Sequence, residues 1–428
     1  MSVARLEGPL AERAPAGAVV DAVSSSAPPA RAEKAQPRIL FLDLTNDPGS
    51  DRIAAEMGRS GALCAVVGVR SAFSARSRFV RRFFPLPHWG GLALRSFVLG
   101  RRLEDIVRDW SPDLIMPTDD LAARVIRDRR IYRRASPALR RLIERSFGDP
   151  AGFAVACSRQ GLAEAARAVG VRMPRQAIVG DLDAAGRTAA AFGYPVVLKR
   201  ELSCGGFGVA IARDEEELAS AFRRSRLRAA AKRLLGWAPG FSLEGQAPLT
   251  LQRYVRGALA YRVVACVDGV ETEGVSFVAQ REDAEETSAS AIVRRLDHAE
   301  MRETTRRIVA ALRCSGIVSL DFILDDAGEA YLIELNARPI ASGHLGRLYG
   351  HDVYAAAIGT RAGEPAPVPP RAIALFPRAL DRDPTGAHLA TSSGVLHDVP
   401  WDDEGVVRAY ARWLRDRHPR CELGSLVA

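Results

Sequence analysis

The sequence predicts an α/β domain followed by a longer α+β region. Short β-rich apolar runs alternate with helical patterns up to about residue 150, which is typical of a parallel sheet, whereas strands outnumber helices after residue 158 and must pair mainly antiparallel. The length of 428 residues fits about two to four domains. With 47% hydrophobic and 26% charged residues, the composition is that of a globular protein and excludes collagen-like and coiled-coil chains.

The first 36 residues are rich in Ala, Pro and Ser and show no hydrophobic periodicity. We expect residues 1–36 to form a disordered tail, because so few apolar groups cannot offset the entropy of ordering the chain. This segment also lacks the continuous apolar stretch of a secretion signal, and the chain has no run of about 18 apolar residues that could span a membrane. The sequence therefore predicts a cytoplasmic protein without a membrane span.

The first folded domain is expected over residues 37–150. It begins with a strand at 38–44, continues through a helical pattern to a second strand at 62–69, and contains an amphipathic helix at 103–110. A buried strand at 112–120 ends in polar residues, and open α/β sheets place their ligands at such strand ends. The pattern predicts a small doubly wound domain.

Two features of this domain have alternative interpretations. Asp119 and Asp120, at the end of the last strand, could contact a substrate, or one of them could cap the N-terminus of the following helix. The segment 124–134 is rich in arginine, as in nucleic-acid-binding proteins, but Tyr132 is its only ring that could stack on a base. We interpret these arginines as a solvated helix face and do not expect nucleic-acid binding.

The second half of the chain contains the remaining predicted elements. Helices are expected at 158–168, 183–192 and from 214, with an Arg/Ala-rich insertion at 222–236, and strands at 195–200, 249–255, 260–267, 274–279, 316–324 and 330–334. A further strand and an amphipathic helix that ends near residue 415 form a C-terminal extension.

Lys199 is the first candidate site residue. Only three of the 60 lysines and arginines are lysines, and Lys199 alone ends an apolar β-run before a glycine-rich loop, 203–209, which contains Gly205, Gly206 and Gly208. Glycines let backbone N–H groups approach a polyphosphate closely, and an ammonium adds a point charge on the same oxygens. The loop is neither a Walker A motif nor a dinucleotide fingerprint. The alternative is a plain glycine hairpin with a chance lysine.

A predicted β-hairpin at 320–336 carries a candidate metal site. Asp321 lies on its first strand, and Glu334 and Asn336, two residues apart on the second, point to one face. Carboxylate and amide oxygens without His or Cys favour Mg2+ or Mn2+, typically shared with substrate phosphates. The alternative is an exposed hairpin with two solvated acids.

Two apolar residues and an arginine complete this segment. Ile333 and Leu335 are expected to form the apolar opposite face of the second strand. Arg338 follows Asn336 by two residues, and Pro339 favours an extended backbone that keeps both on the same side. An arginine at this place can bind a planar anion through two N–H groups, whether an acyl phosphate or a substrate carboxylate.

The segment LQRYVRG at 251–257 is a strand end that breaks at glycine. Such a segment suits a hinge whose backbone amide and carbonyl pair with a flat heterocycle. This segment is a candidate for nucleotide binding because it lies between Lys199 and Glu334 in the sequence.

These four segments, in this order, resemble the ATP-grasp superfamily of carboxylate–amine ligases and biotin-dependent carboxylase subunits. The resemblance covers about residues 37–365, and its most specific motif is E-x-N-x-R-P at 334–339. It implies a Rossmann-like domain followed by a two-subdomain ATP-grasp fold that clamps ATP. The implied organisation is a Rossmann-like domain at 37–150, a subdomain with the phosphate-covering glycine loop at 151–248, a subdomain with the metal site at 249–365, and an extension at 366–428 that packs back on the ATP domain.

The resemblance also implies roles for individual residues. Lys199 would contact the α- and β-phosphates and the adenine, and the loop with Ser203, Gly205, Gly206 and Gly208 would close over the phosphates. Gln252, with the backbone around Arg253, Tyr254 and Val255, would hold the adenine edge. Asp321, Glu334 and Asn336 would coordinate Mg2+, and Arg338 would bind the acyl-phosphate end. Arg159 would contact phosphate, although Ser158 stands before it where such proteins often have an acid.

The expected function is that of an ATP- and Mg2+-dependent ligase. It would activate a small-molecule carboxylate as an acyl phosphate and join it to an amine, releasing ADP and phosphate. The alternatives are a non-catalytic or regulatory ATP-binding protein and a biotin-type carboxylase, against which the absence of a Met-Lys-Met segment argues. The resemblance allows a homodimer. Whether His344 contacts substrate or has a structural role stays open.

Overall fold

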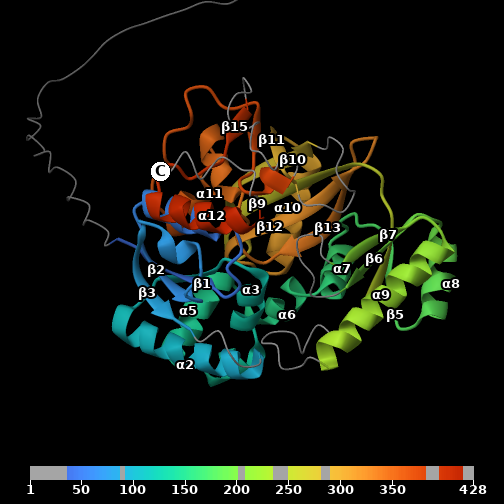
Figure 1. The fold of residues 1–428 in the computed structure, drawn as a ribbon, viewed down its shortest axis with the longest axis horizontal. Helices are drawn as coiled ribbons and strands as arrows, with labels where there is room; N and C mark the ends of the chain where they lie inside the picture. Colours follow the sequence, from blue (N-terminus) through green and yellow to red (C-terminus); the bar gives the residue numbers. More distant parts are fainter. Residues whose placement is uncertain are drawn as a thin grey trace, which may run out of the picture. The chain divides into compact units, whose positions relative to one another are not determined.

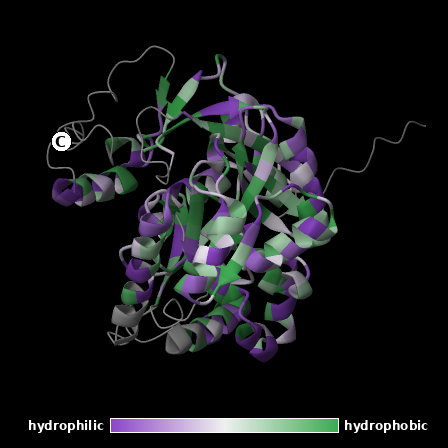
Figure 2. Cartoon of the chain, turned by 90° about the vertical axis from the view of Figure 1, so that its right-hand side faces the viewer, coloured by the Kyte–Doolittle hydropathy of each residue, from purple (hydrophilic) through white to green (hydrophobic). Residues whose placement is uncertain are grey.

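The computed structural model describes residues 36–86, 92–200, 208–234, 249–280, 290–381 and 395–417. Its strands form three sheets, and Figure 1 shows the helices that cover them. Apolar residues are concentrated in the strands and on the helix faces that contact them (Figure 2). None of the helices in these ranges is long and apolar enough to cross a membrane.

The first sheet is parallel, with the order β3-β2-β1-β4. Because successive side chains of a strand point to opposite faces, Ile39 and Phe41 pack with α1, whereas Leu40 and Leu42 pack with α2 and α5. The strands are β1 (Arg38–Asp43), β2 (Leu63–Gly68), β3 (Val80–Pro85) and β4 (Leu114–Pro117), and the helices are α1 (Ser50–Arg59), α2 (Leu92–Trp110) and α5 (Pro137–Phe147), with a short helix η1 at Ser74–Arg76.

Strand β3 was not predicted from the sequence. Arg81 and Arg82 interrupt its apolar pattern, which an edge strand tolerates because part of it faces solvent.

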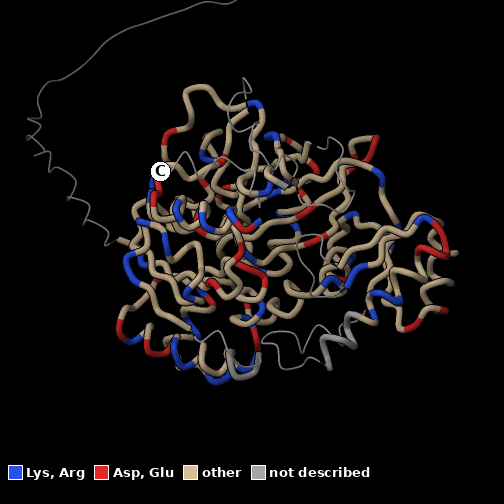
Figure 3. Tube along the Cα trace, in the orientation of Figure 1, with Lys and Arg blue, Asp and Glu red and all other residues tan. Residues whose placement is uncertain are grey.

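The arginine-rich segment forms two short helices, α3 (Asp120–Ile126) and α4 (Arg129–Arg134). Arg127 between them is buried, and its guanidinium lies 4.3 Å from the ring centre of Phe147. The predicted solvated face is therefore wrong at Arg127, because an aromatic ring and a helix-end carbonyl take up its charge. Elsewhere, Lys and Arg are spread over many elements along the trace (Figure 3).

The second sheet has seven strands in the order β13-β12-β9-β10-β11-β14-β15. Only the last pair, β14 and β15, is parallel. The strands are β9 (Ala258–Val267), β10 (Val270–Gln280), β11 (Ile292–Leu296), β12 (Gly316–Leu324), β13 (Ala330–Asn336), β14 (Ala372–Ala374) and β15 (Val395–His397), and the associated helices are α10 (Ala299–Ala311), η4 (Gly343–Tyr349) and α11 (Val353–Ile358). Strand β11 and helix α10 were missed in the sequence.

The third sheet is antiparallel, with the order β5-β8-β6-β7. Its strands are β5 (Gln176–Val179), β6 (Val196–Arg200), β7 (Val209–Ala212) and β8 (Leu249–Arg253), and it packs on α8 (Leu182–Phe192) and α9 (Glu215–Leu234). The predicted insertion helix at 222–236 is wrong as a separate element, because α9 continues through it to Leu234. Short helices η2 (Pro150–Gly152) and α6 (Phe153–Ala156) and helix α7 (Arg159–Ala168) precede this sheet.

The C-terminal segment joins two parts of the molecule. Strand β14 extends the seven-stranded sheet, whereas α12 (Glu404–Arg417) packs on the N-terminal part of the chain. Tyr410 of α12 stacks on Phe73 at 4.2 Å between ring centres and donates a hydrogen bond to Asp51. The expectation that this helix packs on the ATP domain is wrong, because an amphipathic pattern shows which face is buried and leaves the partner open.

Candidate functional site

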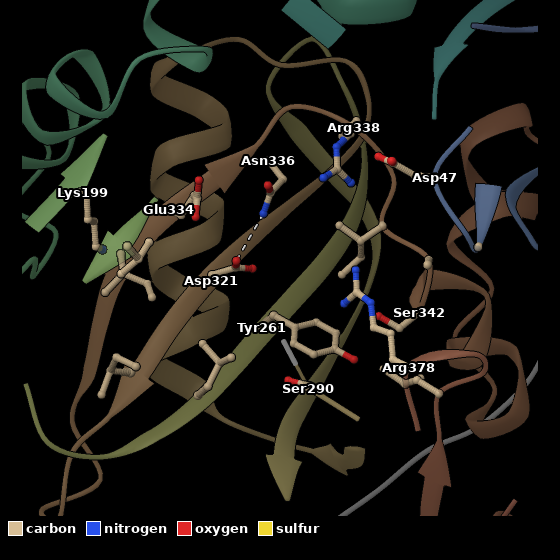
Figure 4. Close-up of a pocket in the computed structure, with 18 of the residues that line it drawn as sticks. Asp47, Lys199, Tyr261, Ser290, Asp321, Glu334, Asn336, Arg338, Ser342 and Arg378 are labelled. Carbon is tan, nitrogen blue, oxygen red and sulfur yellow. Dashed lines mark hydrogen bonds between the residues drawn. The ribbon is translucent and has the colours of Figure 1, made fainter. Parts of the chain in front are cut away.

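A cavity of about 310 Å³ lies where the three sheets approach one another. Figure 4 shows side chains from β6, β9, β12 and β13 pointing into it. Ten of the predicted site residues line this cavity: Arg159, Lys199, Gln252, Arg253, Tyr254, Val255, Asp321, Glu334, Asn336 and Arg338. Of the predicted loop residues, Ser203, Gly205 and Gly206 lie outside the described residues, and Gly208 immediately precedes cavity-lining Val209.

The predicted hairpin forms as expected from β12 and β13, and Asp321 lies directly opposite Glu334. A bulge between Asp321 and Phe322 leaves one residue of β13 without a partner. The bulge turns Ile333 into the cavity together with Glu334, while Leu335 packs in the core. The prediction that Ile333 and Leu335 share an apolar face is therefore wrong, because strict alternation fails at a bulge.

Asp321 lies on β12 and is half-buried at the cavity wall. Burial, followed by the neighbouring charge of Glu334, raises the pKa of Asp321 to about 7. Asn336 Nδ2 donates a hydrogen bond of 3.3 Å to Asp321 Oδ2, which leaves the amide oxygen for another partner.

The donor set fits a hard divalent cation. It consists of two carboxylates and one amide oxygen, and within the described ranges no cluster of three or more His, Cys, Asp or Glu side chains could hold a metal alone. Mg2+ commonly takes one or two carboxylates from the protein and its other ligands from water and phosphate. A Mg2+ ion at Asp321, Glu334 and Asn336 would thus share its coordination with a bound polyphosphate.

Lys199 lies on β6, opposite Val209 of β7 and Thr250 of β8. Only 7% of its surface is exposed. Burial and the nearby Arg159 lower the pKa of the Lys199 ammonium to about 8, against the opposing effect of Glu334 and Asp321. A buried ammonium gains most from an anion placed next to it, such as a phosphate.

Arg159 is the first residue of α7, and Ser158 caps that helix by accepting a hydrogen bond from the Gly161 N–H. The Arg159 guanidinium donates to Glu334 Oε1 at 2.8 Å and to the Arg200 carbonyl at 2.9 Å. The position of Ser158, where an acid was expected, is thus explained by capping. In this structure Arg159 offsets the charge of a candidate metal ligand.

Arg338 points into the cavity and forms a two-point ion pair with Asp120. Its Nε and Nη2 atoms lie 2.7 and 2.9 Å from the two carboxylate oxygens. Asp119 instead caps α3 by accepting from the Ala122 N–H at 2.8 Å. The two aspartates therefore differ in role: Asp119 is the helix cap, and Asp120 holds the cavity arginine.

The segment at the end of β8 lines the cavity opposite the hairpin. Gln252 is buried, and its Nε2 donates to Gln176 Oε1 at 3.0 Å. The backbone N–H of Arg253 bonds to the Arg175 carbonyl and thereby continues the sheet edge. Gln252 is thus braced from β5, with its remaining polar atoms and the following backbone at the cavity wall.

His344 does not line the cavity. Its Nε2 lies 2.8 Å from Asp398 Oδ1, and the same carboxylate lies 3.6 Å from Arg52. The structural interpretation of His344 therefore holds: it braces Asp398, which does line the cavity.

Several cavity residues were missed in the sequence. They follow strands of the N-terminal sheet, lie on β9, precede β11, connect β13 to η4, or belong to the C-terminal segment: Asp47, Pro48, Gly49, Ser50, Thr118, Tyr261, Ser290, Ile340, Ala341, Ser342, Leu375, Phe376, Pro377, Arg378 and Asp398. No local spacing marks them, because they reach the cavity only through packing of distant segments. Only for the residues after β1 did the sequence give an indication, because a polar turn follows that strand.

Comparison with known proteins shows two partial sequence matches. Residues 158–235 match the family described as carbamoyl-phosphate synthase L chain, ATP binding domain. The carbamoyl phosphate synthase large chains of Mycobacterium sp. strains JLS and MCS are each 26% identical over 197 residues, which is 44% of this chain and 16% of the relative. This chain thus spans only 16% of the length of these curated relatives.

Solved structures match over a larger part. The biotin carboxylase domain of 2-oxoglutarate carboxylase from Hydrogenobacter thermophilus gives a TM-score of 0.55 at 18% identity, covering 77% of this chain and 70% of that one. N5-carboxyaminoimidazole synthetase from Staphylococcus aureus gives 0.54 at 13% identity, covering 77% and 78%. Biotin carboxylase from Campylobacter jejuni gives 0.55 at 16%, covering 77% and 72%. At the level of fold, these similarities confirm the resemblance predicted from the sequence.

Proposed function

We propose that this chain, which adopts the ATP-grasp fold, is an ATP- and Mg2+-dependent ligase. It activates a small-molecule carboxylate as an acyl phosphate and joins it to an amine, with release of ADP and phosphate. The observation that carries the proposal is the convergence in one cavity of a buried lysine, two carboxylates, an amide and an arginine. Two fold relatives support the nucleotide, since the Hydrogenobacter domain was solved with MgADP and the Staphylococcus enzyme with ADP.

The proposed organisation follows the fold. The parallel sheet and its helices form a Rossmann-like domain at 37–150, and the two ATP-grasp subdomains occupy 151–248 and 249–365. The segment 366–428 is an extension that closes the cavity with residues after β14. A cytoplasmic location and a homodimer stay predictions.

The nucleotide lies between β6 and the hairpin in this proposal. Apolar side chains of Val197, Ile211, Ile323 and Ile333 line the cavity and offer flat contact to adenine. Gln252 and the backbone of 253–255 present polar groups to the adenine edge, and the Lys199 ammonium contacts the phosphates. That the loop with Ser203, Gly205, Gly206 and Gly208 covers the phosphates stays a prediction, because most of this loop lies outside the described residues.

Asp321, Glu334 and Asn336 would hold Mg2+, which would neutralise phosphate oxygens and so favour attack on the γ-phosphoryl group. The chain's cations act on the same oxygens, and burial strengthens their effect because water is excluded. Arg159 stands beside Glu334 and can turn its charge toward phosphate.

Arg338 orients the carboxylate substrate. A carboxylate oxygen attacks the γ-phosphorus in line, the bond to the bridging oxygen breaks, and ADP leaves. The amine then attacks the acyl carbon, and phosphate departs as the amide forms and the nitrogen loses a proton. Asp120 takes two of the Arg338 N–H groups and so fixes the plane of the guanidinium, whose charge attracts the substrate carboxylate and the acyl phosphate.

The direct test is an ADP-release screen over pairs of carboxylates and amines, with mass spectrometry of the product. We expect ADP and phosphate to appear together with an amide, and only when Mg2+ or Mn2+ is present. Production of AMP would contradict the proposal. So would a rate of ATP turnover that no added carboxylate or amine changes.

A further inference from the structure

A second polar group of residues lies in the same cavity, one strand away from the proposed metal ligands. In the seven-stranded sheet, Asp321 is the cross-strand neighbour of Glu334 on one side and of Tyr261 in β9 on the other. Directly opposed residues of antiparallel strands have Cα atoms about 4.5–5.5 Å apart and point to the same face. Tyr261 therefore extends the row of side chains that begins with the two carboxylates, and Figure 4 shows its hydroxyl on the side away from Lys199.

We call the set of Tyr261, Ser290, Ser342 and Arg378 the Arg378 cluster. All four line the cavity, and they come from β9, the segment before β11, the segment before η4 and the helix η5 (Arg378–Asp381). Tyr261, Ser290 and Ser342 are 6%, 9% and 5% exposed, so their hydroxyls are turned away from bulk water. Every member can donate a hydrogen bond, and no member carries a negative charge at neutral pH.

The Tyr261 hydroxyl is buried without a hydrogen bond of standard geometry to any described residue. Burial raises the pKa of Tyr261, while the nearby Ser342 hydroxyl and Arg378 guanidinium act in the opposite direction. These three groups therefore lie close together, as Figure 4 also shows. A buried donor without a partner is costly to the fold, so the cluster is built to receive an acceptor.

Arg378 differs from two other cavity arginines in its ion pairing. The cavity arginines Arg159 and Arg338 form ion pairs with Glu334 and Asp120, but in the described part of the chain no ion pair involves Arg378.

Asp398 is the carboxylate of the C-terminal segment that lines the cavity. It is engaged by His344 at 2.8 Å and by Arg52 at 3.6 Å. Asp47, from the turn after β1, and Asp321 of β12 also line the cavity. The charge of Asp398 is therefore offset by its own partners, and the cluster presents donors that are not already matched.

We propose that the Arg378 cluster binds an oxyanion of the small-molecule substrate, a carboxylate or a phosphate, distinct from the carboxyl group that is phosphorylated. The inference rests on the proposed function, because it adds a specificity site to the same cavity. A guanidinium offers two parallel N–H groups to such an anion, and the three hydroxyls supply further donors. The substrate is then a dicarboxylic or phosphorylated compound, and the C-terminal segment selects it through Arg378.

The test measures binding to the full chain by calorimetry in the presence of saturating MgADP. Matched probes differ in one oxyanion: L-glutamate against L-glutamine, L-aspartate against L-asparagine, and glycerol 3-phosphate against glycerol. We expect at least one oxyanion-bearing probe to bind at least about tenfold more tightly than its neutral partner, a difference typical of one charge-assisted contact. The amino acid pairs report a carboxylate site, and the glycerol pair reports a phosphate site.

Two variants and one control assign the preference to the cluster. Arg378→Leu should abolish it, and Tyr261→Phe, which keeps the ring, should reduce it by a smaller factor. Arg371→Leu removes an exposed arginine outside the cavity and should retain the wild-type preference.

Binding of MgADP by itself distinguishes a failure of the proposed function from a failure of the oxyanion site. Failure of the wild type to bind MgADP would refute the proposed function and the inference with it. Normal MgADP binding without a preference in any probe pair, or with a preference that survives Arg378→Leu, would overturn the inference alone. Loss of MgADP binding in Arg378→Leu would also overturn it, because Arg378 would then serve the nucleotide or the fold.

Discussion

The low pKa of Lys199 predicts that nucleotide affinity falls as pH rises above about 8. Only the protonated ammonium attracts phosphate, and a bound phosphate in turn stabilises that proton. Affinity is therefore highest below the pKa of the nucleotide-free protein and decreases above it. An ordinary exposed lysine, with a pKa near 10.4, would show no such loss before about pH 10.

The size of the effect follows from the pKa. At pH 9.5, which is about 1.5 units above the pKa, about 3% of Lys199 keeps its proton, so MgADP should bind roughly thirtyfold more weakly than at pH 7. This factor corresponds to about 2 kcal/mol. The bound phosphate keeps Lys199 protonated throughout this range, so the full free energy of protonating Lys199 appears in the binding free energy.

Calorimetric titration of MgADP between pH 7 and 9.5 measures this dependence. ADP is suitable because its phosphates are already ionised over the range. Lys199→Met should bind weakly at every pH with no slope, and Lys199→Arg should show no slope because arginine keeps its charge. A flat wild-type profile, or a slope that persists in Lys199→Met, would refute the assignment of Lys199 to the phosphates.

Three further substitutions test other parts of the structure. Glu334→Gln removes a charge from the proposed metal site and should lower ATP turnover at least about a hundredfold at nearly unchanged melting temperature. Near-parental turnover would show that Glu334 is not part of that site. Arg338→Lys keeps the charge but cannot form the two-point contact with Asp120 that fixes the side chain, so kcat/KM for ADP release should fall about tenfold or more. An unchanged value would contradict the role of Arg338. Tyr410→Phe removes two buried hydrogen bonds of 2.8 Å, with the Gly49 N–H and with Asp51, and should lower the free energy of unfolding by about 1–3 kcal/mol in urea titrations. Equal stability would show that these two hydrogen bonds add no net stability.

Parts of the candidate site with a local pattern could be predicted from the sequence. Glu334 and Asn336 share a face because they are two residues apart on a strand, and Lys199 stands out because it ends an apolar run before glycines. The bulge beside Asp321 was not predictable, because it depends on how β12 pairs with its neighbours. It reverses the expected place of Ile333 relative to the core.

The ion-pair partners of the charged cavity residues could not be predicted from neighbouring residues in the sequence. The sequence contains far more arginines than a single site can use, so position along the chain could not show that Arg338 pairs with Asp120 or Arg159 with Glu334. Both pairs join residues more than 170 positions apart. Their geometry comes from the packing of α3 and α7 against the hairpin.

The sequence by itself determined most of the strands and helices, the hairpin with its three candidate oxygen ligands and the lysine at the end of an apolar strand. Each of these depends on the side-chain period of a strand or on turn residues, which act over a few positions. Only the tertiary structure decided that the segment after β14, with Arg378, belongs to the wall of the cavity and that α12 packs on the N-terminal part of the chain. The physical reason is that an apolar face or a charge needs a partner, but many partners of similar chemistry are available, and the one that is used is selected by the packing of the whole chain.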